Sequence, residues 1–384
     1  MNILIYTLYY PAPPHLRTQP DTLLIHYFAK ELKREGHNVQ VVFLSLHRLQ
    51  DVFRNRFRDI VPTEADYVQE EIPVHLIRYQ SVIPRRTFPG HLQAKQIDRM
   101  LKRFKEGLGW KPDRVFVHFP SAFTGITEVL ADGVPVLGDF HNFDIHELER
   151  PYAGEAEAYF RRIPAWGARN RNIAKRLREL DGSHPLAIVY SGIGSSLIAP
   201  ESFILEKAAR QGEKLHVLYA GQLIPLKNVD ILIRSMAELS FPCDLTIVGD
   251  GPERDRLEKL AAGSPDIVFK GRLSREETIR CMQDADVFMM LSRPETYGMV
   301  YLEALAQGCL TAAGRGEGFD GFIRDGENGF LGEPGSVQEA ARILEEIHAM
   351  DAGSRREMVL AGYGLACGMT EERMAELFLS LNQT

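Results

Sequence analysis

Short apolar runs alternate with segments of helical spacing along the first half of the chain. Residues 2–9 form one such run, residues 23–32 place apolar side chains on one helical face, and Gly36 follows as a helix end. Residues 39–46 form the next run. A strand, a helix and a second strand in this order predict a parallel sheet, because parallel strands need a crossover connection. Further strand-like runs are residues 74–77, 115–119 and 134–137.

The second half of the chain repeats this alternation after a polar, helical stretch at residues 151–185. An apolar run then enters a glycine-rich turn at residues 188–194, which we interpret as a domain boundary. Beyond it, strand-like runs recur, and each leads into a loop. These runs are residues 215–220, 245–248, 267–269 and 285–291. The pattern predicts an α/β fold with two Rossmann-like, doubly wound domains, residues 1–190 and 191–369, and a last helix within 370–384.

Two basic, partly apolar segments interrupt the first predicted domain, residues 48–58 and 85–110. In the second segment Arg99, Lys102 and Arg103 stand among apolar residues. A basic amphipathic helix can lie on an anionic membrane surface. We favour the alternative, a helix that packs on the sheet and keeps its basic side chains in water.

Composition narrows the class of protein. The chain of 384 residues is 45% hydrophobic and 25% charged, which is typical of soluble two-domain proteins. Its four cysteines are far apart and suggest neither disulfides nor a metal site. The net charge of −7 is uneven, because the first half is net basic and the second carries the acidic excess. We interpret residues 1–6 as a first strand rather than a signal peptide, and expect a cytoplasmic protein without a nucleic-acid partner.

The most informative stretch is residues 292–303, which carry two carboxylates, Glu295 and Glu303, with Gly298 between them. An apolar strand precedes this stretch and a helical pattern continues from it. A loop that opens a helix after a buried strand is a common anion site, and a glycine there lets a ligand approach the backbone. A carboxylate at each end suits the hydroxyls of a sugar or a ribose.

Other polar residues follow predicted strands. Lys227, in the loop at residues 221–228, is a point charge suited to phosphate, although a solvated loop lysine is the alternative. His141 lies just past the run at 134–137, where α/β proteins build sites, and His118 has weaker claims. The first strand–helix loop has no G-x-G-x-x-G, which leaves a dinucleotide site there unsupported.

Five motifs in the same order resemble retaining GT-B glycosyltransferases of family 4. They are the E-x7-E motif at residues 292–303, the G-R-L…K loop at 220–227, the G-x-G-P turn at 248–252, the D-G-x-N-G segment at 323–330 and the V-x-N-G-V entry at 189–193. The resemblance covers residues 189–345 well and the first domain less well. It implies the GT-B architecture, with two Rossmann-like domains facing each other across a cleft and the last helix packed back on the first domain.

The resemblance also implies roles for individual residues. Glu295 matches the glutamate that contacts the donor sugar, Glu303 the one that binds ribose, and Lys227 the diphosphate lysine. His141 matches the histidine that reaches the donor sugar, so that His141, Glu295 and Lys227 form the implied catalytic set. The other implied donor-binding residues are Gly221, Gln222, Gly249, Arg272, Leu273, Tyr297, Gly298 and Met299, with Arg272 and Leu273 at the nucleobase.

Two departures from the family pattern concern the diphosphate and the acceptor. Gln222 stands where many members have an arginine, so Lys227 and backbone amides would carry more of the diphosphate's charge. The first loop lacks a glycine pair that many relatives have, and we interpret Arg17 as a substitute anion contact. His15 and His118 complete the acceptor-side candidates.

The expected reaction is the transfer of a sugar from a nucleotide diphosphate sugar to a hydroxyl, with retention at the anomeric carbon. A UDP-sugar is favoured over a GDP-sugar, and the acceptor would be a glycan, a lipid-linked glycan or a small molecule of glycoconjugate or polysaccharide biosynthesis. Neither a metal nor another cofactor is expected. Peripheral contact with the inner face of the membrane would use the basic first domain. The alternatives are a GT-B sugar-nucleotide epimerase or hydrolase and a non-catalytic nucleotide-sugar-binding relative.

Overall fold

The protein divides into two compact units. The structure, a computed structural model, describes residues 1–16, 23–48, 64–81, 89–130, 133–210 and 212–381. Unit 1 comprises Met1–Arg169, Ile173–Val189 and Glu371–Thr384, and unit 2 comprises Asn170–Asn172 and Tyr190–Thr370. The chain therefore passes from unit 1 to unit 2 at Val189, beside the expected boundary at residue 190.

Unit 1 is built on an eight-stranded sheet in the order β3-β4-β2-β1-β5-β6-β7-β8. Every neighbouring pair is parallel except β3 with β4. The strands are β1 (Asn2–Thr7), β2 (Asn38–Arg48), β3 (Glu64–Gln69), β4 (Ile72–Ser81), β5 (Arg114–His118), β6 (Val136–Phe140), β7 (Ala165–Ala168) and β8 (Leu186–Ile188). The α/β fold expected from the alternating pattern is confirmed.

Two strands of unit 1 correct the sequence-based expectation. β3 is an antiparallel edge strand, joined to β4 by Glu70 and Glu71, which both have positive φ. Its residues are mostly half-exposed, so it lacks the apolar run that marks a buried strand. β7 lies inside the stretch 151–185 that was expected to be helical. It is four residues long and fully buried, too short for its pattern to separate it from the helices beside it.

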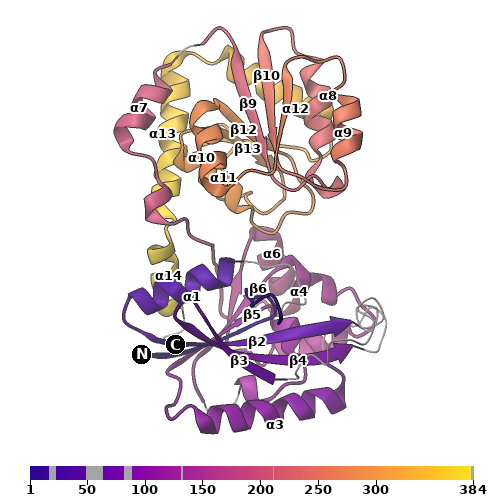
Figure 1. Ribbon diagram of the computed structural model, residues 1–384, viewed down its shortest axis with the longest axis vertical. Helices are drawn as coiled ribbons and strands as arrows, with labels where there is room; N and C mark the ends of the chain where they lie inside the picture. The colour runs from indigo at the N-terminus through magenta and orange to yellow at the C-terminus, as the bar shows by residue number, and fades with distance from the viewer. Residues whose placement is uncertain (17–22, 49–63, 82–88, 131–132, 211, 382–384) are drawn as a thin grey trace. The chain divides into compact units, whose positions relative to one another are not determined.

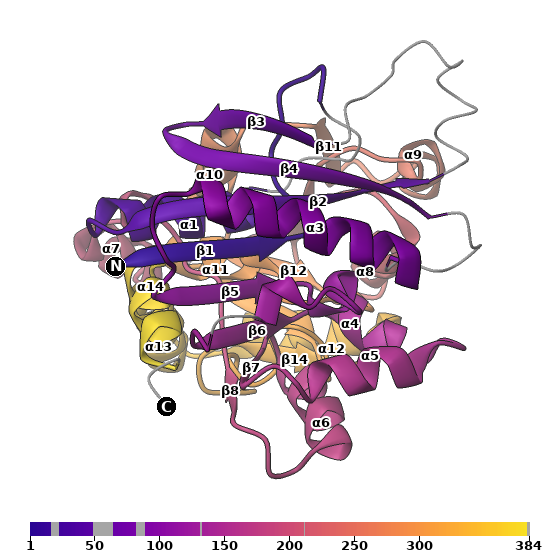
Figure 2. The ribbon, with the colours of Figure 1, turned by 90° about the horizontal axis from the view of Figure 1, so that it is seen from below.

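Helices cover both faces of the unit 1 sheet, with α1 (Leu24–Arg34) and α14 (Glu371–Ser380) on one face and α3 (His91–Gly107) on the other (Figures 1 and 2). α3 buries Ala94, Ile97, Met100 and Leu101, whereas its basic residues Arg99, Lys102 and Arg103 are exposed. The interpretation of this segment as a helix packed on the sheet is confirmed. The other basic segment, residues 48–58, lies almost entirely outside the described residues.

The C-terminal helix α14 belongs to unit 1, although the helix before it, α13 (Ala352–Gly368), belongs to unit 2. Phe378 of α14 is fully buried. Its ring centroid lies 4.8 Å from that of Phe28 and 5.8 Å from that of Phe116. This aromatic contact joins the two ends of the sequence, and burial of a ring of this size is among the larger apolar contributions a helix can make.

Unit 2 contains a wholly parallel six-stranded sheet in the order β11-β10-β9-β12-β13-β14. The strands are β9 (Leu215–Ala220), β10 (Cys243–Val248), β11 (Ile267–Gly271), β12 (Val287–Met290), β13 (Leu310–Gly314) and β14 (Phe330–Gly332). Its central strands are buried on both faces, which explains why their sequences are continuous apolar runs rather than alternating ones.

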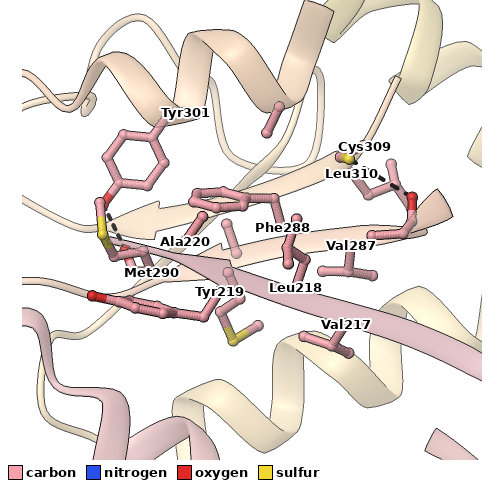
Figure 3. Packing of buried hydrophobic residues seen from close by; sticks show 14 of the residues in the cluster. Val217, Leu218, Tyr219, Ala220, Val287, Phe288, Met290, Tyr301, Cys309 and Leu310 are labelled. Carbon is pink, nitrogen blue, oxygen red and sulfur yellow. Dashed lines mark hydrogen bonds between the residues drawn. The ribbon is translucent and has the colours of Figure 1, made fainter. Parts of the chain in front are cut away.

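The helices of unit 2 lie in two layers (Figure 1). α8 (Val229–Met236), α9 (Arg254–Leu260) and α12 (Val337–Ala349) cover one face of the sheet, and α10 (Arg275–Asp284), α11 (Met299–Ala306) and α13 the other. Figure 3 shows the core between β12 and α11, where the rings of Phe288 and Tyr301 meet edge to face at 5.8 Å. The Tyr301 hydroxyl donates to the carbonyl of Met290 at 2.6 Å, which fixes α11 against the end of β12.

Within the described residues, no helix combines the length and the apolar content that a membrane crossing requires. All four cysteines are free, with Cys243 and Cys309 buried.

Candidate functional site

Two glycine-containing loops pack backbone to backbone at the carboxyl edge of the unit 2 sheet. The N–H of Gly221 donates to the carbonyl of Val248, and that of Leu223 to the carbonyl of Asp250, both at 3.0 Å. Gly249 has a φ of +139°, and a Cβ at this position would lie 1.8 Å from the carbonyl oxygen of Gly221. The G-x-G-P turn is therefore required for the close approach of two loops, whether or not a ligand is bound.

A third loop, residues 291–298, is tied to the first by backbone contacts. The side-chain amide of Asn228 donates to the carbonyl of Leu291 at 2.7 Å, and the N–H of Arg293 donates to the carbonyl of Leu226 at 2.8 Å. Asn228 has a positive φ and precedes α8, so it both ends the first loop and holds the third. These contacts bring the expected diphosphate loop and the E-x7-E motif to the same edge of the sheet.

Lys227 and Glu295 meet where these loops join. The Lys227 ammonium lies 2.5 Å from a carboxylate oxygen of Glu295, and the Ser292 hydroxyl donates to the same oxygen at 3.1 Å. The side chains are 20% and 12% exposed, so the pair is screened from bulk water but open to a ligand. The structure thus brings together two of the three residues expected to be catalytic.

Glu317, in the loop after β13, holds the backbone of Glu295. It accepts a hydrogen bond from the backbone N–H of Glu295 at 2.8 Å. Burial raises the pKa of Glu317 above its ordinary value, and this N–H opposes the rise by stabilising the ionised form. Nothing in the local sequence around Glu317 indicated this role, because the contact spans 22 residues.

The start of α11 explains the glycine of the E-x7-E motif. Gly298 has a φ of +85°, and a Cβ there would lie 2.4 Å from the ring of Tyr301. Among the described residues, the N–H groups of Gly298 and Met299 have no hydrogen-bond partner. Donor groups without partners at a helix start suit an anion. Tyr297, in contrast, is buried and its hydroxyl donates to the carbonyl of Ser191 at 2.9 Å, so its side chain anchors the loop.

Glu303, on the first turns of α11, is held by an arginine that sequence reasoning missed. The Arg275 guanidinium donates through Nε and Nη2 to one oxygen of Glu303, at 3.0 and 2.7 Å. Arg275 is the first residue of α10, directly after the N-cap Ser274. The sequence could have indicated Arg275 by its position at the start of a helix that follows a strand. First-turn residues of such a helix lie near the carboxyl edge of the sheet. The expected nucleobase residues Arg272 and Leu273 are exposed and half-exposed in the loop just before it.

Gln222, which replaces the family arginine, is exposed, and within the described chain its side chain makes no hydrogen bond. Its carbonyl accepts from the Tyr219 hydroxyl at 2.9 Å, so the backbone of this residue is fixed while the side chain is not.

In unit 1, His141 directly follows β6 and serves as the N-cap position of α4 (Asn142–Glu147). Its ring stacks on Phe119 with centroids 3.9 Å apart. Its Nε2 lies 3.2 Å from a carboxylate oxygen of Asp139, and its backbone N–H donates to Asp144 at 2.8 Å. Burial lowers the pKa of His141 to about 4, because the protonated ring loses more solvation than Asp139 restores. The ring is therefore neutral at pH 7.

Asp139 is the centre of a fully buried cluster. Besides His141, it accepts from His118 Nδ1 at 2.6 Å and from Arg169 Nε at 2.8 and 2.9 Å. Burial opposes the ionisation of Asp139, but Arg169 and the two histidines outweigh it and hold its pKa well below the ordinary value. His118 has no exposed surface, so its side chain supports this cluster instead of meeting an acceptor as expected.

Among the described residues, His118, Asp139 and His141 are also the one group of three potential metal ligands close enough to share an ion. The Arg169 guanidinium already donates to the Asp139 carboxylate that such an ion would need. Its positive charge would also repel a metal cation. The geometry fits a hydrogen-bond cluster better than a metal centre. Of the remaining acceptor-side candidates, His15 is exposed in a turn, and Arg17 lies outside the described residues.

Two family models match the chain and together span most of it. The model of "Glycosyl transferases group 1" matches residues 201–363, and that of "Glycosyltransferase Family 4" matches residues 23–196. The chain belongs to the group 1, family 4 glycosyltransferases. The first match lies in the half that carries the Lys227–Glu295 pair, and the second in the half that carries His141.

Curated relatives agree with this assignment. A lipopolysaccharide core biosynthesis glycosyltransferase of Rhizobium meliloti is 30% identical over 58% of this chain and 65% of its own length. The sulfoquinovosyl transferase SQD2 of Arabidopsis thaliana is 35% identical over 35% of this chain and 27% of its own length. The chain thus covers less than two thirds of the length of either relative.

Solved structures share the fold at low sequence identity. Sucrose-phosphate synthase of Thermosynechococcus elongatus superimposes with a TM-score of 0.71 at 16% identity, covering 99% of this chain and 98% of that one. Anabaena HepE, solved in complex with UDP, gives a TM-score of 0.71 at 17% identity and covers 99% of both chains. The expected GT-B fold class is confirmed.

The packing of Gly249 against Gly221 predicts that Gly249→Ala disturbs the donor loops. We expect it to lower the free energy of unfolding by about 1–3 kcal/mol, because the new methyl group meets a carbonyl oxygen and the positive φ disfavours alanine. Gly364→Ala is the matched control, since Gly364 lies in α13 with ordinary φ and open space around its Cβ position. Urea unfolding of both variants measures the difference, and equal stabilities would contradict the interpretation.

Proposed function

We propose that the protein is a retaining glycosyltransferase that moves a sugar from a nucleotide diphosphate sugar to an acceptor hydroxyl. The observation that carries this proposal is the Lys227–Glu295 pair beside the unpartnered amides of Gly298 and Met299. A cation and amide donors suit a diphosphate, and a carboxylate suits the hydroxyls of a sugar.

Donor recognition follows from these contacts. Lys227 offers an ammonium with three donor hydrogens, so it can bind a phosphate oxygen while it orients Glu295. We assign Glu303 to the ribose hydroxyls, with Arg275 holding its carboxylate in place. Because Gln222 is neutral and its side chain is exposed, Lys227 and the amides supply most of the favourable charge for the diphosphate.

The proposed step breaks the bond between the anomeric carbon and the β-phosphate oxygen, and forms a bond from that carbon to the acceptor oxygen on the same face. The proton of the acceptor hydroxyl passes to the leaving phosphate. Negative charge grows on the diphosphate as the bond breaks, so a fixed ammonium and fixed amides stabilise the transition state more than the ground state. We assign His141, which is neutral, to a hydroxyl of the donor sugar.

A UDP-sugar is the donor that we favour, and this agrees with the UDP bound to Anabaena HepE. The acceptor would be a hydroxyl of a glycan, a lipid-linked glycan or a small molecule. The rhizobial relative acts in lipopolysaccharide core biosynthesis, which supports a role in glycoconjugate assembly.

Glu303→Gln is expected to weaken UDP binding by about 10- to 100-fold, because a neutral amide loses the charge-assisted hydrogen bonds to ribose and its pairing with Arg275. His141→Ala should leave UDP affinity almost unchanged, since the sugar is absent from UDP. Calorimetric titration with UDP, GDP and ADP measures both effects and ranks the bases.

Glu276→Gln serves as the control in this titration. Glu276 lies on α10 one residue after Arg275, is exposed, and has no assigned role. Binding of none of the three nucleotides to the wild-type protein would remove the donor assignment, and equal losses in Glu276→Gln and Glu303→Gln would remove the role of Glu303.

The exposed basic face of α3 predicts binding to anionic membranes if the acceptor is lipid-linked. Reversing the charges of Arg99, Lys102 and Arg103 should abolish co-sedimentation with vesicles that contain anionic lipid. Reversal of three exposed basic residues of unit 2, Arg210, Lys259 and Arg280, is the matched control. Wild-type protein that stays in the supernatant at low salt would instead indicate a soluble acceptor.

A further inference from the structure

The buried carboxylate of Asp139 collects hydrogen bonds from three side chains on three different segments. His118 lies at the end of β5, Arg169 directly after β7, and His141 directly after β6. Asp139 itself has no exposed surface. None of these segments is adjacent in sequence to another, so the cluster depends on the neighbouring positions of β5, β6 and β7 in the sheet.

The positions of the protons in this cluster follow from its composition. An ionised carboxylate has no hydrogen to donate, so each nitrogen facing it must carry one. Arg169 keeps Asp139 ionised, since its guanidinium donates to both carboxylate oxygens. His141 must therefore carry its hydrogen on Nε2, and His118 on Nδ1. A neutral imidazole has one such hydrogen, which leaves Nδ1 of His141 as an acceptor.

The two histidines differ in how far a ligand can reach them. The free nitrogen of His118, Nε2, is enclosed and has no partner among the described residues. The free nitrogen of His141, Nδ1, also has no partner there, but it is not one of the enclosed atoms, and 7% of the side chain is exposed. His141 is the member of the cluster that can accept a hydrogen bond from outside it.

We propose that Asp139, held by Arg169 and His118, is a positioning residue that fixes His141 as the tautomer with its hydrogen on Nε2 and its acceptor nitrogen open to a hydroxyl of the donor sugar. The last step, the hydrogen bond to the donor sugar, rests on the proposed function. The tautomer of His141 does not depend on it. The stacking of Phe119 on the ring and the hydrogen bond from the His141 N–H to Asp144 fix the ring plane and the backbone beneath it.

The C-terminal helix closes this cluster. The ring of Phe378 stacks on His118 with centroids 6.1 Å apart, and the Arg169 guanidinium lies 5.7 Å from the same ring. Phe378 therefore covers the two side chains that hold Asp139. Replacing this ring with a smaller side chain would expose His118 and Arg169 to water and weaken their hold on Asp139.

Overall stability against pH cannot report this cluster cleanly, because its groups act in opposite directions. Unfolded His141 takes up a proton near pH 6.5 and the folded residue only near pH 4, so acid in this window favours unfolding. Burial raises the pKa of Asp144 to about 7, so the folded state takes up that proton first and gains stability in part of the same window. A site-specific measurement is required, with Asp139, His118 and Arg169 as the other charged or titratable neighbours.

Long-range ¹⁵N–¹H correlation spectra of the ¹⁵N-labelled full chain report imidazole tautomers directly. His141 is assigned from the signals lost in His141→Ala. We expect the wild-type ring to be neutral at pH 7 with its hydrogen on Nε2, and Asp139→Asn to lose that uniform tautomer. Asp144→Asn, which alters the backbone support but not the ring partner, should keep it. A wild-type ring with its hydrogen on Nδ1, or a mixture of tautomers, would overturn the proposal.

Asp139→Asn leaves Arg169 buried without a counter-charge and can prevent folding. The pair Asp139→Asn with Arg169→Gln removes both charges together and provides the second variant, whose ring should likewise lose its uniform tautomer. Retention of the Nε2 hydrogen in a folded double variant would show that Asp139 does not set the tautomer.

Kinetics then connect the tautomer with the proposed function. Asp139→Asn should lower kcat by about 100-fold with little change in UDP affinity, and should add almost nothing when His141 is already alanine. Additive losses in this double-mutant cycle would mean a structural role for Asp139. If the spectra show the expected tautomer and no sugar nucleotide is turned over, the proposed function fails while the positioning of His141 stands.

Discussion

The ion pair between Lys227 and Glu295 depends on close backbone packing between two glycines, Gly249 and Gly221. A side chain at Gly249 would obstruct this packing. Gly249 and Gly221 are in close contact, and the loops after β9, β10 and β12 hydrogen-bond to one another. These contacts fix the loops that carry Lys227 and Glu295. The parallel sheet supplies this arrangement, because all its strands end at one edge. Removing either charge would leave the other partly buried and unpaired, so the pair also helps to hold the two loops together.

In unit 1, a buried charged side chain, that of Asp139, holds His141 in place. Asp139 stays ionised inside the protein because Arg169 and two histidines donate to it, and the aromatic ring of Phe378 excludes water from the cluster. Burial would be costly for a lone carboxylate, but these hydrogen bonds offset the cost. One of them also holds the imidazole of His141 in place. Each unit therefore holds a candidate site residue, Glu295 in unit 2 and His141 in unit 1, through hydrogen bonds to other side chains.

The sequence predicted what depends on local pattern and missed what depends on distant pairing. Continuous apolar runs indicated most buried strands, and motif matching singled out Lys227 and Glu295, which the structure pairs. The four-residue strand β7 and the half-exposed edge strand β3 carry too little pattern to be recognised. Arg275, Glu317 and Arg169 act on residues 22 to 30 positions away, and only the folded sheet brings them together. Asp139 stood beside the candidate histidine but had no visible partner.

Turnover of sugar nucleotides tests most directly whether this chain transfers a sugar from a nucleotide donor. Purified protein is incubated with UDP-, GDP- and ADP-sugars, and release of the nucleoside diphosphate is followed with and without acceptors, including slow hydrolysis by water. We predict release from one class of donor, chiefly UDP-sugars, and loss of this release in Glu295→Gln and in His141→Ala. Tight nucleotide binding with no release from any donor would contradict it and indicate a binding protein instead.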